Sequence, residues 1–168
     1  MVEKTMWCWW WGWNPGKLEN WLEEKERQGW NLAAVNMSSV GFRLKQGEPR
    51  QISYCVDYQV NPTPEYYSIL VDDGWELAWS GYGGWHLWRK PYSNHESKPF
   101  LHTENQPIII RTRWDLGLTA FFMVFFFITS ILAATASVNS AAVFLGILGV
   151  LFGVFFIRFF QYYSKLRA

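Results

Sequence analysis

Two apolar segments near the end of the sequence constrain the fold more than any other feature. Residues 116–136 contain no charged side chain, and residues 141–160 contain only Arg158. Each segment has the roughly 20 residues that an α-helix needs to cross a bilayer core of about 30 Å. Both are apolar all round, whereas a helix on the surface of a soluble protein would carry a polar stripe. We therefore predict a transmembrane hairpin over residues 116–160, in preference to a hairpin buried inside a soluble protein.

The residues that flank this hairpin predict its orientation. The connection, residues 137–140, carries no charge, whereas both outer ends carry Arg or Lys. Because basic residues remain on the cytoplasmic side of a membrane, we expect both chain termini to be cytoplasmic. The start of the sequence shows no small-residue cleavage site, so we expect no cleavable signal peptide. The residues expected to anchor the hairpin at the membrane interface are Arg111, Arg113, Trp114, Arg158, Tyr162 and Tyr163.

The part of the chain before the hairpin has the length and composition of one small domain. We expect residues 1–90 to form a cytoplasmic domain, residues 91–115 a polar connector and residues 161–168 a cytoplasmic tail. Most of the 12 Trp residues precede residue 90, and their large rings help so short a domain to bury a core. A net charge of +1 provides no basic face, so we expect no nucleic-acid partner.

This domain contains an internal repeat. Residues 6–15 (MWCWWWGWNP) align without gaps on residues 53–62 (SYCVDYQVNP), and in both copies a helical segment follows and ends at Gly-Trp. Repetition of this kind means one supersecondary unit used twice. The alignment pairs Cys8 with Cys55, Gly29 with Gly74, Ala33 with Ala78, and Phe42 with Trp85.

Each copy reads as strand, helix, strand, strand. Aromatic and β-branched residues predict the opening strands, Thr63 before Pro64 predicts the start of the second helix, and Gly29 and Gly74 predict the helix ends. We expect an α+β fold in which the duplicated units form one antiparallel sheet with both helices on one face. The expected strands are residues 5–13, 31–36, 41–46, 51–60, 76–80 and 84–90, and the expected helices are residues 16–28 and a segment between Thr63 and Gly74.

The alternation of side chains along the opening strands assigns their two faces. The face expected to form the core against the helices carries Trp7, Trp9, Trp11 and Trp13 in the first unit and Tyr54, Val56, Tyr58 and Val60 in the second. The opposite face is mixed and partly polar, so it is either the solvated back of the sheet or a binding surface. On the first helix, the residues expected to point inward are Leu18, Trp21 and Leu22, and those expected to point outward include Glu19 and Glu23.

The mixed face carries the candidate ligand-binding residues, which are Trp10, Asp57, Cys8 and Cys55. Asp57 is the one acid in an aromatic strand and could hold a cation beside the Trp10 ring, through charge and cation–π attraction. The alternative is a solvent-facing Asp. For the two cysteines, a redox pair or a soft-metal site stands against the commoner role of a small buried apolar residue.

The sequence shows no pattern typical of a metal centre. There is no Cys-x-x-Cys motif, and the histidines are separated, with His86 on a strand and His95 and His102 in the connector. Structural zinc sites need four such ligands at close spacing. We therefore expect neither a metal nor a cofactor, and no disulfide in a reducing compartment.

Several segments together resemble a known family. They are LENWLEEKERQGWNL, GFRLKQGEPRQISYCVDYQV and YYSILVDDGWELAWSGYGGWHLWRKP, followed by the two apolar spans. The chain is similar, over nearly its whole length, to the bacterial membrane family catalogued as domain of unknown function 2812. Such proteins are often encoded beside PadR-type regulators, so the resemblance implies a regulatory or stress-response role, and it implies no catalytic residues. The layout is also similar to that of multidrug-sensor domains, which bind bulky cationic aromatic molecules.

The combined observations predict a binding module and no enzyme, because no nucleophile–base pair or phosphate loop is present. We expect a membrane-tethered cytoplasmic sensor that binds a hydrophobic or cationic compound in an aromatic groove and signals through a protein partner. The alternative is a structural or accessory subunit of a larger membrane complex. Gly149 and Gly153 form a small-xxx-small motif, which lets helices approach closely within the hairpin or between chains of a homo-oligomer.

Overall fold

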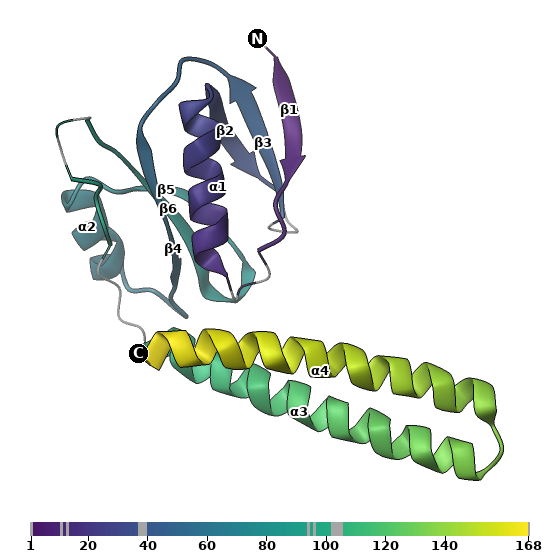
Figure 1. Ribbon diagram of the computed structural model, residues 1–168. Coiled ribbons are helices and arrows are strands. Elements are labelled where there is room, and N and C mark those ends of the chain that lie inside the picture. Colours follow the sequence, from purple (N-terminus) through teal and green to yellow (C-terminus); the bar gives the residue numbers. More distant parts are fainter. Residues whose placement is uncertain are drawn as a thin grey trace. The chain divides into compact units, whose positions relative to one another are not determined.

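The strands of the chain pair in two antiparallel sheets of three strands each. The computed structural model describes residues 2–10, 12, 14–36, 40–93, 95, 97–101 and 106–167. It divides into an N-terminal domain, Met1–Glu104, and a helical hairpin, Asn105–Ala168 (Figure 1). The elements in chain order are β1 (Glu3–Trp7), α1 (Pro15–Arg27), β2 (Trp30–Val35), β3 (Gly41–Gln46), β4 (Ile52–Tyr58), α2 (Pro64–Asp72), β5 (Glu76–Ser80), the 3-10 turn η1 (Tyr82–Gly84), β6 (Trp85–Pro91), α3 (Gln106–Thr135) and α4 (Asn139–Arg167).

The two sheets confirm the α+β class and the duplication. The strand orders, β1-β3-β2 and β4-β6-β5, are the same in the two repeats. Instead of the one sheet expected, each repeat forms its own sheet, and β2 contacts β5 without sharing a backbone ladder. Both of these strands carry a bulge, at Ala33 and at Ala78. The pairing of these two alanines in the sequence alignment is therefore correct. Bulges are common on edge strands, and β2 and β5 are both edge strands.

The opening strands align differently from the expectation. Trp7 pairs with Gly41 in the first repeat, and Tyr58 pairs with Trp85 in the second. Just beyond these pairs, Cys8 N donates to Val40 O and Gln59 N donates to Gly84 O, each over 2.8 Å. Cys8 thus corresponds to Gln59 and not to Cys55, and the predicted equivalence of the two cysteines is wrong.

The same register shows that Phe42 corresponds to His86 and not to Trp85. Phe42 follows Gly41, the partner of the last residue of β1, and His86 follows Trp85, the partner of the last residue of β4. The gapless alignment fails because the segment between β1 and α1 is longer than the segment between β4 and α2. The first strand also ends at Trp7, earlier than residue 13. Trp11 and Trp13 lie outside the described residues.

Both helices of the domain begin and end as their sequences predict. The Asn14 side chain accepts from Lys17 N and the Thr63 hydroxyl accepts from Tyr66 N, and a proline follows each of these N-caps. Gly29 and Gly74 follow the helices with φ of 78° and 82°, the left-handed conformation that ends many helices.

The assignment of sheet faces is wrong in the first repeat and only partly correct in the second, where Tyr54 of the expected core face is buried and bonds to Glu26 of α1. Trp7 and Trp9 are exposed, with 58% and 53% of their surface accessible, whereas Trp10 is buried. In the second sheet, α2 covers the face that carries Asp57 and packs Leu70 against Trp88. The face expected to be solvated or open is therefore core, because the Tyr66 hydroxyl of α2 bonds to the Asp57 carboxylate and lets it be buried.

Helix α1 lies along the open edge of β4 and contacts β2 as well (Figure 1). Glu19 accepts from Val56 N over 2.8 Å, and Glu23 accepts from Tyr54 N over 3.2 Å. These two glutamates were expected to point outward. They point toward β4 because the unpaired N–H groups of an edge strand need acceptors, and carboxylates one helical turn apart reach alternate residues of the strand.

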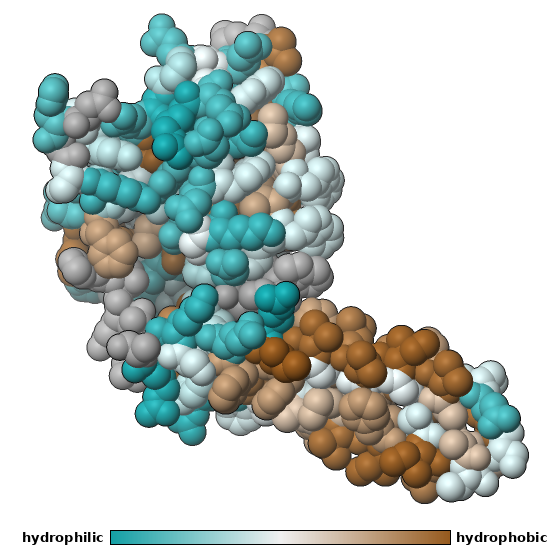
Figure 2. Space-filling view, viewed as in Figure 1, coloured by the Kyte–Doolittle hydropathy of each residue, from teal (hydrophilic) through white to brown (hydrophobic). Residues whose placement is uncertain are grey.

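The helical hairpin consists of two helices that are long and apolar enough to cross a bilayer, Pro107–Thr135 and Asn139–Arg167. Figure 2 shows apolar side chains over the middle of the hairpin and polar ones at its two ends. The helices extend beyond the predicted spans, since α3 begins at Gln106, inside the expected connector. The six predicted interface anchors lie near the start of α3 and near the end of α4, and their contact with lipid stays a prediction.

Gly149 and Gly153 pack inside the hairpin. A Cβ atom at Gly149 would lie 3.3 Å from the Phe127 ring, and one at Gly153 would lie 3.5 Å from Met123 Sδ. Small residues at these positions allow the two helices to approach closely. The motif therefore serves the contact between α3 and α4.

Candidate functional site

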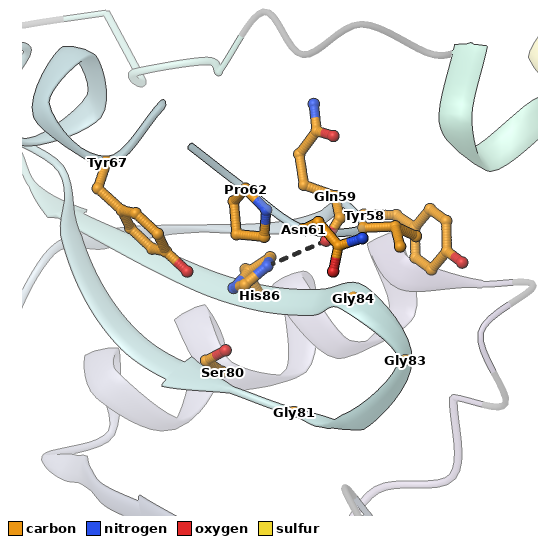
Figure 3. Close-up of a pocket in the computed structure, with 11 residues that line it drawn as sticks. Tyr58, Gln59, Asn61, Pro62, Tyr67, Ser80, Gly81, Gly83, Gly84 and His86 are labelled. Atoms are coloured by element: carbon orange, nitrogen blue, oxygen red, sulfur yellow. Dashed lines mark hydrogen bonds between the residues drawn. The ribbon is translucent and has the colours of Figure 1, made fainter. Parts of the chain in front are cut away.

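A pocket of about 410 Å³ opens in the second repeat, between the start of α2 and the connection from β5 to β6. This volume lies within the range of small-molecule sites in proteins. No described residue that lines it carries a formal charge. Figure 3 shows the lining residues, which are Tyr58, Gln59, Val60, Asn61, Pro62, Tyr67, Ser80, Gly81, Gly83, Gly84 and His86.

Local backbone conformation shapes the two sides of this pocket. Asn61 adopts the left-handed conformation with φ of 54° as the chain leaves β4. On the other side, Gly84 has φ of 89°, and a Cβ atom there would lie 2.7 Å from Gln59 O. Only glycine fits this close approach, so the two segments can meet at the end of the sheet through the bond from Gln59 N to Gly84 O.

His86 is the most buried titratable side chain among the described residues that line the pocket. It is 3% exposed, and its Nε2 lies 3.3 Å from Gln59 O. A carbonyl oxygen only accepts hydrogen bonds, so Nε2 carries the proton. The Nδ1 atom is buried and has no hydrogen-bond partner among the described residues. A buried polar atom in this state is costly unless something binds it.

Two tyrosines of α2 surround the His86 ring. The ring centroids of Tyr66 and Tyr67 lie 5.9 Å and 6.0 Å from that of His86. In Figure 3 the Tyr67 side chain points toward His86, and Pro62 and Ser80 flank it, whereas the Tyr58 ring points away. The space beside His86 is therefore bordered by the Tyr67 and Pro62 rings and by glycine backbone.

A hydrogen-bonded chain lies behind His86 in the core. Trp88 Nε1 donates to the Tyr66 hydroxyl over 3.1 Å, and that hydroxyl donates to Asp57 Oδ2 over 2.5 Å. Asp57 Oδ1 also accepts from Tyr58 N. Burial, and then the Asp57 carboxylate, raise the pKa of Tyr66, so the hydroxyl keeps its proton and remains a donor.

The predicted ligand residues are not brought together in one groove. Trp10 packs edge-on against Trp85, with ring centroids 5.0 Å apart, while Asp57 pairs with His86, the next residue of β6. Successive strand residues point to opposite faces, so β6 separates Trp10 from Asp57. Asp57 is 4% exposed and is engaged with Tyr66.

The two cysteines are unpaired thiols with little nucleophilic character. Burial raises the pKa of Cys8. Burial raises the pKa of Cys55 as well, and the carboxylates of Glu19 and Asp57 raise it further. A protonated buried thiol is a weak nucleophile and a poor metal ligand, so these residues act as small apolar side chains.

The described residues contain no group of three His, Cys, Asp or Glu side chains that could hold a metal ion. His95 is exposed, and His102 lies outside the described residues. His86 and Tyr67, which border the pocket, were not identified from the sequence as ligand residues. The sequence signal that could have found them is the difference between Phe42 in the first repeat and His86 at the equivalent position of the second. This difference is visible only when the two repeats are aligned in the correct register.

Comparison with known proteins gives one match. A family model described as "Protein of unknown function (DUF2812)" matches residues 14–122, from the N-cap of α1 into the first half of α3. No match was found among curated proteins or among solved structures. The matched segment makes up more than half of the 168-residue chain and includes the whole pocket. The chain therefore belongs to the DUF2812 family of proteins of unknown function.

Proposed function

We propose that this protein is a membrane-anchored sensor without catalytic activity, which binds a lipophilic small molecule in the pocket beside His86 and signals through a protein partner. The observation that carries the proposal is the buried Nδ1 atom of His86, without a partner among the described residues, at the wall of a 410 Å³ pocket. A largely uncharged pocket with a few convergent polar groups is the usual form of a small-molecule site.

The internal repeat supports this proposal. At the positions of Asp57 and His86, the first repeat has Met6 and Phe42, which pair directly in the same register. Phe42 packs against Trp21 of α1 with ring centroids 5.3 Å apart, and it is 1% exposed. An apolar pair therefore satisfies the same fold in the first repeat. Because buried polar groups cost stability, their presence in the second repeat indicates a role other than packing.

The helical hairpin supports a lipophilic ligand. Two helices long and apolar enough to cross a bilayer would keep the domain at the membrane surface, where apolar compounds concentrate by partition. We propose a cytoplasmic location for the domain and for both termini, following the positions of the basic residues at the outer ends of the hairpin.

Ligand binding by the full-length protein in lipid nanodiscs tests this proposal. A panel of small lipophilic ring compounds, including phenols, indoles and arylamines, is titrated and binding is followed by saturation-transfer NMR. Ser80 lies at the pocket, so Ser80→Trp fills the space. Ser68 lies on the exposed side of α2, so Ser68→Trp is the matched control.

We expect saturable binding by the wild type and by Ser68→Trp, and its loss in Ser80→Trp. Absence of binding across the panel, or equal binding by both variants, would overturn the sensor proposal. Absence of binding together with a stoichiometric membrane protein that copurifies in mild detergent would instead favour an accessory subunit of a larger complex.

A further inference from the structure

We infer that the ligand of this pocket is a neutral aromatic ring compound that donates one N–H or O–H hydrogen bond to His86 Nδ1. The inference rests on the proposed function and gives the chemical class of the ligand. It follows from the tautomer of His86, from the absence of charge on the described lining, and from the surfaces that border the space.

The tautomer decides the direction of the hydrogen bond. His86 Nε2 faces the Gln59 carbonyl oxygen at 3.3 Å, and that oxygen offers no proton. The proton of a neutral imidazole therefore sits on Nε2, and Nδ1 presents a lone pair. A ligand group that satisfies Nδ1 must bring a hydrogen, which a hydroxyl, an indole N–H or an aniline N–H does and an ether or a tertiary amine does not.

The charges around the pocket argue against an anion. The described lining carries no Lys or Arg, and the buried carboxylate of Asp57 lies directly across the sheet from His86. A carboxylate or phosphate placed here would be desolvated without a counter-ion and beside a like charge, which is strongly unfavourable. A neutral donor avoids both costs.

The shape of the lining favours a flat ring. Beside His86 the pocket offers the Tyr67 and Pro62 rings (Figure 3) and the backbone of the Gly83–Gly84 turn. Aromatic and glycine surfaces leave room for a planar molecule that packs by offset or edge contacts.

Matched ligand pairs test the inference in the full-length protein in nanodiscs. Indole and 1-methylindole differ only in the N–H, and phenol and anisole differ only in the O–H. We expect the donor of each pair to bind about tenfold tighter or more, since its partner leaves a buried acceptor unsatisfied. In His86→Phe, which installs the residue of the first repeat, we expect the two members of each pair to bind equally.

A second readout keeps the inference testable if His86→Phe folds poorly. The imidazole nitrogens of the wild type, labelled with ¹⁵N-histidine and assigned by replacing His95 and His102 with Gln, report the hydrogen bond directly. We expect the Nδ1 resonance of His86 to shift with indole and to stay in place with 1-methylindole. Equal binding of the methylated and unmethylated ligands by the wild type would overturn the inference while leaving the sensor proposal intact. Absence of binding by every ring compound would overturn the sensor proposal itself.

Discussion

The Tyr54 hydroxyl donates a hydrogen bond to Glu26 Oε1 over 2.7 Å, and this bond joins the second repeat to the helix of the first. Glu26 is 1% exposed and is saturated with donors. Leu32 N reaches the same oxygen over 2.9 Å, and the Arg50 guanidinium and Asn31 reach the other. A buried carboxylate with this many partners holds four segments of the domain together.

Removal of this carboxylate is expected to destabilise the domain strongly. Glu26→Ala leaves the Tyr54 hydroxyl and Leu32 N without an acceptor, so we expect the free energy of unfolding to fall by about 3 kcal/mol. Denaturant unfolding followed by Trp fluorescence in nanodiscs measures the change. Glu24, in an exposed pair with Arg27 on the same helix, is the control, and Glu24→Ala should cost about 0.5 kcal/mol or less. Equal effects of the two substitutions would contradict the role of Glu26.

Glu19 is expected to make stability depend on pH. Burial raises the pKa of Glu19 above its ordinary value of 4.5, although the hydrogen bond from Val56 N opposes the shift. Between 4.5 and the raised pKa the folded state holds more protons than the unfolded state, so this residue lowers stability as pH rises through that window.

Glu19→Gln keeps an oxygen acceptor for Val56 N and removes the buried charge. We therefore expect the variant to gain stability over the wild type at pH 7 and to lose this advantage at pH 4, as measured by unfolding at both values. Glu48 has an exposed side chain, and Glu48→Gln should show no such difference. A Glu19→Gln variant less stable than the wild type at pH 7 would show that the charge contributes favourably.

The cysteines are expected to resist alkylation in the folded protein. Cys8 is 4% exposed, and burial raises the pKa of both thiols, so the thiolate that reacts is scarce. Iodoacetamide labelling followed by intact-mass spectrometry should show slow modification at pH 8 and complete modification of both residues after denaturation. Rapid modification of Cys55 in the folded state would contradict its placement under α2.

In the turn at the pocket, we expect glycine to be required more strictly at position 84 than at position 83. Gly84→Ala introduces a left-handed non-glycine residue and a Cβ 2.7 Å from Gln59 O, so we expect a loss of about 2 kcal/mol or more and impaired ligand binding. Gly83 has φ of 75° and no atom within 4 Å of an added Cβ, so Gly83→Ala should cost only about 1 kcal/mol. Both values follow from denaturant unfolding, and similar losses would contradict the close approach at Gly84.

The helical hairpin makes a prediction about location and orientation. Its two apolar helices should keep the full-length protein in the membrane fraction until detergent is added. A fluorescent protein fused to either terminus should fluoresce in the cytoplasm, and alkaline phosphatase fused to either terminus should be inactive. An active phosphatase at one terminus would contradict the predicted orientation.

Local signals in the sequence predicted the parts of this fold that depend on neighbours in the chain. Thr63 and the glycines after the helices mark the start of α2 and the ends of both helices, because caps satisfy backbone groups within one turn. The apolar runs predicted the two long helices of the hairpin because each run has about the 20 residues that a helix needs to cross a bilayer. The repeat alignment paired Ala33 with Ala78, where the two bulges lie, but it did not predict that either strand would contain a bulge.

The register and the site depend on contacts that a gapless alignment misses. A shift in strand pairing by one residue moves each side chain to the other face of the sheet. The gapless alignment was shifted by one residue in β6, so it paired Phe42 with Trp85 in place of His86. Glu19 and Glu23 were expected to face water because they are charged, and they turn inward because an unpaired strand edge lies opposite. Asp57 was identified, but its partner Tyr66 comes from a helix whose position depends on tertiary packing.

Hydrogen exchange in the nanodisc-embedded protein tests the central claim most directly, namely that the second repeat has exchanged an apolar core for a ligand site. With saturating indole, we predict slower amide exchange in peptides that cover residues 58–62 and 80–86. We predict unchanged exchange at residues 40–42 of the first repeat, which correspond to residues 84–86. Protection of neither segment, or equal protection of both repeats, would contradict the account.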